Sequence, residues 1–283
     1  MTLRNHRFSV GGAAAILCSL VLVTGCETRP VTVTIKSVAA AKEDAKEDDK
    51  AGAPEASGWG NLTGTVTLTG GAPSLPALVT KGDPNVKDSS VCAAETVPNE
   101  TLVVDAASSG IANVVIFLEK PATIKPELKK PPETPIVFDQ KGCRFFPHFL
   151  LVRVGQTVLV KSGDAVAHNT HTYTTRNTSF NQLVPPNFRE GLLLKYTKSE
   201  SNPINVGCDL HPWMQALHFP VDHPYAAVTD KNGKFRIEGL PAGKHSFKVW
   251  QERGKYLDRK LEVTIEADKD ASVDLKYATS QFN

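Results

Sequence analysis

The stretch LTGTVTLTG, residues 62–70, alternates threonine with Leu62, Val66 and Leu68. Because successive side chains of a β-strand point to opposite faces of the sheet, this period of two predicts a strand with one buried face. Similar runs of β-branched and aromatic residues recur between Gly, Pro, Asn and Asp, at residues 101–105, 113–119, 150–162, 226–230, 234–240, 245–250 and 259–267. From residue 59 onward no run has the spacing of an amphipathic helix. The sequence therefore predicts an all-β fold with room for two sandwich-sized cores.

Residues 226–254, AAVTDKNGKFRIEGLPAGKHSFKVWQERG, contain the chemistry of two tight turns, at 230–233 and at 240–243. The stretch resembles the carboxypeptidase regulatory-like, or transthyretin-like, β-sandwich. The pattern of that family is a Thr-Asp-x-x-Gly-x-Phe turn, then Leu-Pro-x-Gly-x and an aromatic residue or His. The matching residues here are Thr229, Asp230, Gly233, Phe235, Leu240, Pro241, Gly243 and His245.

Two strands precede this turn in that family, and their counterparts occur far upstream here, at residues 64–73 and 111–119. The resemblance therefore implies a split sandwich. We predict that residues 59–132 and 224–277 form this sandwich and that a second domain, residues 133–223, is inserted between them. Simple tandem order of two domains is the alternative.

The predicted edges of the insert have the composition of connectors. Residues 125–135, KPELKKPPETP, are rich in Pro and Lys, and residues 220–224 begin and end with Pro. Insertion at an exposed loop is tolerated because the termini of small domains often lie close together.

The insert contains the residues with the clearest chemistry. In NVGCDLHPWMQAL, residues 205–217, Cys208, His211 and Met214 are three positions apart, and His168 lies upstream after two predicted strands. Two imidazoles, one thiolate and a weak axial thioether are the donors of a type 1 copper site. The sulfur donors favour Cu(I), and the imidazoles keep Cu(II) acceptable. The four residues therefore predict a mononuclear copper site suited to one-electron transfer.

The insert resembles a cupredoxin, and its Cys-x-x-His-Pro-x-Met loop is similar to that of amicyanin, a relative of plastocyanin and pseudoazurin. The resemblance implies a Greek-key β-sandwich. It implies that Asn169, directly after His168, hydrogen-bonds to the cysteine loop and protects the sulfur. It also implies that His211 is the ligand at the solvent edge, with Pro212 and Trp213 forming an apolar rim for electron entry and exit.

Each residue of this set also has a simpler explanation. Cys208 fits a disulfide, Met214 fits a hydrophobic core, and His211 with Pro212 fits a turn. His171, three residues after His168, is an alternative first ligand. The joint occurrence of these residues in one β-domain favours the metal site.

Other chemistries are disfavoured by what the sequence lacks. It has no Cys-x-x-Cys zinc knuckle and no second Cys in the loop for a binuclear copper site. It has no His-x-His pair of the kind that multicopper oxidases and nitrite reductases use. We therefore expect an electron carrier with a redox donor and acceptor, and not an enzyme. The alternative is a non-redox surface protein whose cupredoxin-like module is structural, binds a ligand or sequesters copper.

Three of the five cysteines remain for the predicted folded domains: Cys92, Cys143 and Cys208. An odd number in an oxidising compartment leaves one unpaired. Because Cys208 belongs to the candidate copper set, we expect the disulfide to join Cys92 and Cys143. Spacing alone leaves pairing of Cys208 with either of the others open.

The first residues predict export. Arg4 and Arg7 precede an apolar run that ends in Val-Thr-Gly-Cys, which resembles a bacterial lipobox and implies a signal peptide over residues 1–25 and a lipid on Cys26. An ordinary signal peptide cut near Gly25 is the alternative. Residues 26–58 are charged and Ala-rich, as expected for a disordered tether to a membrane. The protein is thus expected to be a membrane-anchored lipoprotein, periplasmic or at the cell surface.

The charge balance is neutral. Removal of Arg4 and Arg7 with the signal peptide reduces the 32 Lys and Arg residues to 30. This number equals that of the 30 Asp and Glu residues, so the net charge is zero. A neutral chain with interspersed signs gives no basis for nucleic-acid binding.

Overall fold

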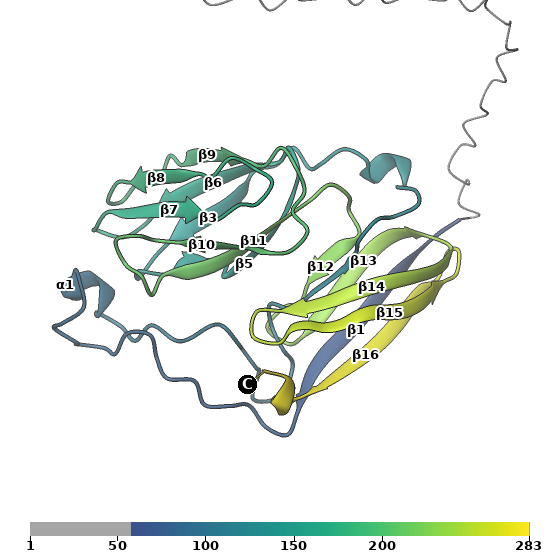
Figure 1. The fold of residues 1–283 in the computed structure, drawn as a ribbon, viewed down its shortest axis with the longest axis horizontal. Coiled ribbons are helices and arrows are strands. Elements are labelled where there is room, and N and C mark those ends of the chain that lie inside the picture. Colours follow the sequence, from purple (N-terminus) through teal and green to yellow (C-terminus); the bar gives the residue numbers. More distant parts are fainter. Residues whose placement is uncertain (1–57, 283) are drawn as a thin grey trace, which may run out of the picture. The chain divides into compact units, whose positions relative to one another are not determined.

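The computed structural model describes residues 58–282, and these residues are nearly all β. The predicted signal peptide, the lipid site Cys26 and almost all of the predicted tether lie outside this range. No helix within residues 58–282 is long and apolar enough to span a membrane. The strands form four sheets (Figure 1). The prediction of an all-β sandwich fold is confirmed.

Two sheets form the first sandwich. One sheet contains β1 (Trp59–Thr69) between β13 (Lys234–Pro241) and β16 (Asp270–Ala278). The other has the order β12-β2-β14-β15, with β12 at Ala226–Val228, β2 at Val115–Leu118, β14 at Gly243–Gln251 and β15 at Lys255–Ile265. Strands from before residue 132 thus pair directly with strands from after residue 224.

The core of this first sandwich follows the pattern seen in the sequence. Leu62, Val66 and Leu68 are buried, and they pack with Ile116 and Phe247 of the facing sheet. The hydrophobic residues of the 62–70 stretch therefore form the buried face of β1, and the threonines form its partly exposed face.

The second sandwich uses only residues between these segments. Its five-stranded sheet has the order β5-β11-β10-β7-β8 and its four-stranded sheet the order β4-β3-β6-β9. The strands are β3 (Ile136–Gln140), β4 (Phe145–Phe146), β5 (Phe149–Arg153), β6 (Thr157–Ser162), β7 (His168–Thr172), β8 (Asn181–Val184), β9 (Leu192–Lys195), β10 (Ile204–Gly207) and β11 (Gln215–Val221). Phe138, Val158, Val160 and Val206 are fully buried in its core, which also contains Cys208.

An apolar contact joins the two sandwiches. All four residues of β2 are buried, because one face of the strand lies in the first core while Val115 and Phe117 face the second sandwich. The Phe117 and Phe219 rings meet edge to face with centroids 4.9 Å apart. A strand buried on both faces is continuously apolar, as the sequence VIFL of β2 is.

Two parts of residues 59–132 differ from expectation. Residues 101–105 are not a strand but make an isolated bridge between Val104 and Ile111, because Asp105 begins a turn that Ser108 and Ser109 close. Residues 78–98, which we call the cover segment, pack against the second sandwich instead of joining a sheet of the first. The cover segment contains a bridge between Val79 and Val97 and the short helix α1 (Ser89–Cys92).

A disulfide fixes the cover segment to the second sandwich. Cys92, the last residue of α1, is bonded to Cys143, which lies between β3 and β4. Cys208 is the free cysteine among residues 58–282, and it is buried. The pairing of Cys92 with Cys143, which was expected because Cys208 belongs to the candidate copper set, is confirmed.

Candidate metal centre

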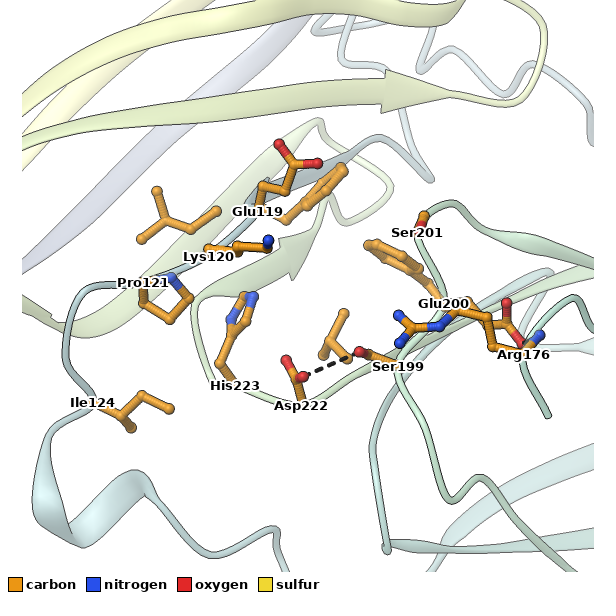
Figure 2. A pocket seen from close by; sticks show the side chains of 14 residues that line it. Glu119, Lys120, Pro121, Ile124, Arg176, Ser199, Glu200, Ser201, Asp222 and His223 are labelled. Atoms are coloured by element: carbon orange, nitrogen blue, oxygen red, sulfur yellow. Dashed lines mark hydrogen bonds between the residues drawn. The ribbon is translucent and has the colours of Figure 1, made fainter. Parts of the chain in front are cut away.

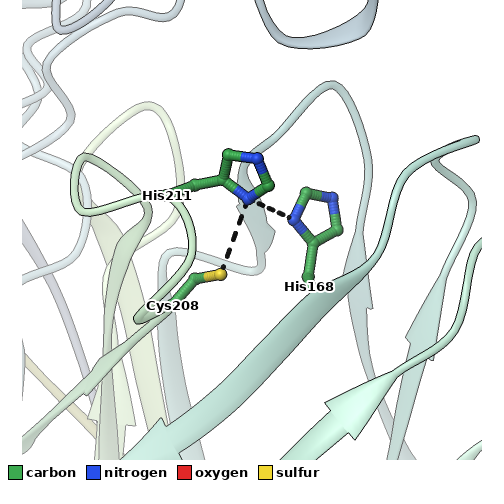
Figure 3. A group of neighbouring side chains, drawn as sticks. All are labelled: His168, Cys208 and His211. Atoms are coloured by element: carbon green, nitrogen blue, oxygen red, sulfur yellow. Dashed lines mark hydrogen bonds between the residues drawn. The ribbon is translucent and has the colours of Figure 1, made fainter. Parts of the chain in front are cut away.

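Strand pairing brings the distant sequence motifs together. β7 begins at His168, and it pairs antiparallel with β10, so that Gly207 lies opposite His171. Cys208 follows Gly207 directly, and the chain therefore continues alongside β7 toward His168. The loop from β10 to β11 then places His211 over the end of β7 (Figure 3).

Three ligand-type atoms converge in the interior at this point. The Nδ1 atoms of His168 and His211 are 2.9 Å apart, and the Cys208 Sγ is 3.7 Å from the His211 Nδ1. All three ligand atoms lie within 4.8 Å of one another. The two histidines are fully buried and Cys208 is 2% exposed. The cluster is therefore shielded from solvent water.

A carboxylate holds the outer nitrogen of each ring. The His168 Nε2 is 2.8 Å from the Asp164 Oδ2, and the His211 Nε2 is 2.9 Å from the Asp88 Oδ2. A ring that donates its Nε2 proton to a carboxylate carries its lone pair on Nδ1. Two such lone pairs 2.9 Å apart repel each other unless a proton or a metal ion lies between them.

The electrostatics of the cluster favour a thiolate. Burial raises the pKa of Cys208, but the neighbouring imidazoles of His168 and His211 and the backbone N–H of Asn169 outweigh it and lower the pKa to about 6. Burial likewise lowers the pKa of His168, but the Asp164 carboxylate and the Cys208 sulfur outweigh it and raise the pKa to about 9. The thiolate is the form of cysteine that binds metals, so the pocket has its sulfur ligand ready at neutral pH.

The donor set fits a single metal ion. In zinc sites, imidazole nitrogen and thiolate sulfur bind at about 2.0 and 2.3 Å, so one first-row ion can reach atoms 2.9 and 3.7 Å apart. Each ring is also fixed by a partner on its far side, which is how metal-binding histidines are usually held. Met214 is 1% exposed and belongs to the same core as Cys208.

Asn169 joins β7 to the cysteine loop. Its backbone N–H donates to the Cys208 Sγ at 3.4 Å, and its side-chain oxygen accepts the backbone N–H of Asp209 at 2.6 Å. Its amide nitrogen donates to the carboxylate of Asp209 and to Asn181. The asparagine therefore fixes the residue after Cys208 and supplies a hydrogen bond to the sulfur itself.

His171 lies apart from the cluster. Its side chain is 25% exposed, its Nδ1 is 3.1 Å from an Asp209 oxygen, and its ring stacks on Tyr173. Neither grouping of metal-binding side chains within residues 58–282 includes it. His168 is thus the histidine of this strand that faces Cys208.

The expectation that His211 lies at the solvent edge is wrong. The ring has no exposed surface, because Asp88 and the rest of the cover segment lie over it. Pro212 is exposed and Trp213 is half-buried, and Trp213 packs against Val79, Ala93 and Val97 of the cover segment. Pro212, Trp213 and Met214 also line a pocket of about 380 Å³.

Sequence reasoning missed both carboxylates. Asp164 lies four residues before His168, and it also accepts the backbone N–H groups of Gly142 and Cys143 at 2.5 and 2.8 Å. The spacing of four residues between Asp164 and His168 is a weak signal that could have suggested this carboxylate. Asp88 is 123 residues from His211, and no local pattern marks it.

Figure 2 shows a larger pocket, of about 570 Å³, whose lining does not include His168, Cys208 or His211. Two of the polar residues that line it, Ser199 and Glu200, have hydrogen-bond partners. Ser199 donates to Asp222, and Glu200 accepts hydrogen bonds from Thr175, Arg176 N–H and Asn177. No residue that lines this pocket belongs to a grouping of metal-binding side chains within residues 58–282, so the buried cluster is the better candidate metal site.

Fold and cluster together define an all-β protein in which a β-sandwich encloses two histidines and a thiol. No family model matches the chain, and no curated protein matches it. Among solved structures, it is similar to amicyanin from Paracoccus versutus, with 15% identity over 38% of this chain and 97% of that one and a TM-score of 0.27. A purple cupredoxin from Nitrosopumilus maritimus is 21% identical over 31% of this chain and 98% of that one, with a TM-score of 0.24.

A copper-containing nitrite reductase from Thermus scotoductus is also similar, with 19% identity and a TM-score of 0.29. That likeness covers 35% of this chain and only 27% of the reductase.

Proposed function

We propose that residues 133–223 bind one copper ion through His168, Cys208, His211 and Met214 and that this type 1 site transfers single electrons. The observation that carries the proposal is the convergence of two imidazole Nδ1 atoms and a buried thiol, with both outer nitrogens held by carboxylates. Bound copper would supply reversible one-electron redox chemistry.

The residues around the site support this use. His168 lies on a sheet strand, and the loop that carries Cys208 and His211 is tied to that strand by Asn169. Donors held by a rigid frame move little when the charge of a bound ion changes. Burial excludes water from the ion and limits ligand exchange.

The setting of this activity is also part of the proposal. We infer an exported protein, anchored to a membrane through a lipid on Cys26, periplasmic or at the cell surface. Its partners would be a redox donor and a redox acceptor and not nucleic acid. It would act as a carrier and not as an enzyme. The first sandwich would be a split carboxypeptidase regulatory-like domain that supports the insert.

One observation favours a second function, copper sequestration. His211 is fully covered, and a covered ligand lengthens the path to an external redox partner. A protein that stores or carries copper gains from the same burial, because burial slows release.

Copper reconstitution of the whole protein tests the proposal. We expect an intense visible band from thiolate-to-copper charge transfer, a type 1 EPR signal and a reversible redox couple. Cys208→Ser should abolish the band, and His171→Ala should keep it as the matched control. A protein that binds copper without colour or a reversible couple would support sequestration, and one that binds no copper would refute both functions.

The anchor needs a separate experiment. Expression in a bacterium with radiolabelled palmitate should label the wild type and not Cys26→Ala. Equal label in both would refute the lipid assignment and leave the copper proposal unaffected.

A further inference from the structure

The cover segment brings a charged side chain to the outer face of the candidate copper site. Asp88 lies directly before α1, and its Oδ2 is 2.9 Å from the Nε2 of His211. His211 has no exposed surface, whereas the Asp88 side chain remains 37% exposed. The carboxylate therefore lies between the buried ring and the solvent.

The local backbone shows that this carboxylate is directed to His211 and not to its own helix. Asp88 occupies the N-cap position of α1, where an aspartate usually accepts a backbone N–H of the first turn. Its side chain makes no such bond, and its backbone is left-handed with φ 53°. Aspartate tolerates that conformation better than most residues.

The disulfide holds this arrangement in place from both sides. Cys92 is four residues after Asp88, and its partner Cys143 donates its backbone N–H to Asp164, the residue that holds His168. One disulfide thus links the regions of both carboxylates: Cys92 lies on the same short segment as Asp88, and Cys143 hydrogen-bonds to Asp164. Val86 and Val91 of the cover segment also pack against the second core.

We propose that Asp88 is a positioning residue for His211: it fixes the ring with its Nδ1 toward Cys208, adds negative charge behind the ligand and closes the site to solvent. This inference rests on the copper site proposed above for its redox consequence. Its structural consequence, the fixed tautomer of His211, does not need copper. A carboxylate behind an imidazole ligand makes the imidazole a stronger donor, and the negative charge favours Cu(II) over Cu(I).

Two substitutions separate position from charge. Asp88→Asn keeps an oxygen that accepts the Nε2 proton but removes the charge, and Asp88→Gly removes the side chain. Both residues tolerate the left-handed backbone, so neither change adds strain. Asp83→Asn is the matched control, because Asp83 lies on the same segment and hydrogen-bonds to Asn85.

The first measurement uses the metal-free protein and NMR of the imidazole nitrogens. We expect His211 to carry its proton on Nε2 in the wild type, in Asp88→Asn and in Asp83→Asn. In Asp88→Gly the proton should distribute over both nitrogens. An unchanged tautomer in Asp88→Gly would overturn the positioning role.

The second measurement uses the copper-loaded protein. We expect a higher reduction potential in Asp88→Asn with the visible band retained. Asp88→Gly should lose about 10-fold or more in copper affinity, as changes behind metal ligands typically do, and should let external imidazole alter the EPR spectrum. A potential in Asp88→Asn equal to that of Asp83→Asn would overturn the charge effect. If no variant binds copper but the tautomer changes in Asp88→Gly, the proposed function fails and the positioning role stands.

Discussion

The Nδ1 atoms of His168 and His211 face each other at 2.9 Å, while the outer nitrogen of each ring is held by a carboxylate. Two lone pairs at this distance repel each other unless a proton or a metal ion lies between them. The fold thus brings these donor atoms together at one buried point.

The choice between the two histidines of β7 can be tested directly. We expect His168→Ala to abolish the visible copper band, because the ring that faces His211 is lost. His171→Ala should keep the band, because that ring points to Asp209. The measurement is copper titration followed by absorption spectroscopy. Loss of the band only in His171→Ala would show that the first ligand is wrongly assigned.

Asn169→Ala should weaken the link between strand and loop. The change leaves the backbone N–H of Asp209 without its acceptor, at a cost of about 1–3 kcal/mol in the free energy of unfolding. Urea unfolding of the metal-free protein measures this loss. Asn181→Ala is the control, because Asn181 contacts the same carboxylate but not that N–H. Equal stability of the two variants would contradict the role assigned to Asn169.

Removal of the disulfide should destabilise the protein and release the cover segment. Cys92 and Cys143 are 51 residues apart, and closing a loop of this size contributes about 4 kcal/mol by restricting the unfolded chain. We expect the double variant Cys92→Ser, Cys143→Ser to lose about 2–5 kcal/mol of its free energy of unfolding, as is typical when a native disulfide is removed. Hydrogen exchange of residues 78–98 should rise in parallel. Unchanged exchange there would show that packing alone holds the segment.

Acid should destabilise the second sandwich through His218. This ring is fully buried beside Tyr196 and Phe138, and burial lowers its pKa to about 3. The folded state therefore keeps the ring neutral, whereas the unfolded chain takes up a proton below its ordinary pKa of about 6.5. The contribution of His218 to the free energy of unfolding is therefore complete above pH 6.5. It is lost as the pH falls toward 3, by up to about 1.4 kcal/mol per pH unit.

The measurement is urea unfolding between pH 7 and pH 4. His218→Gln should have a shallower pH dependence than the wild type over this range, whatever its stability at pH 7. Parallel curves for the two proteins would show that another group causes the acid sensitivity.

Much of the fold was predictable because its signals are local. The alternation in residues 62–70 and the turn residues at 230–233 specify strands and hairpins through neighbouring residues alone. The strand predicted at residues 101–105 is absent because β-branched residues also fit an extended loop. The turn after Asp105 depends on side-chain hydrogen bonds, which the sequence pattern does not show. The exposed position expected for His211 was wrong because the segment that covers it lies far away in the sequence.

The sequence by itself determined the all-β class and the Cys-x-x-His-x-x-Met loop with His168 upstream, but it left the pairing of Cys92, Cys143 and Cys208 open. The class and the loop follow from composition, periodicity and spacing, which need no long-range contact. Only the tertiary structure decided that Asp164 and Asp88 hold the two rings and that His211 is closed to solvent. The physical reason is distance along the chain. A hydrogen bond across 123 residues leaves no periodic trace, so folding alone brings Asp88 to His211.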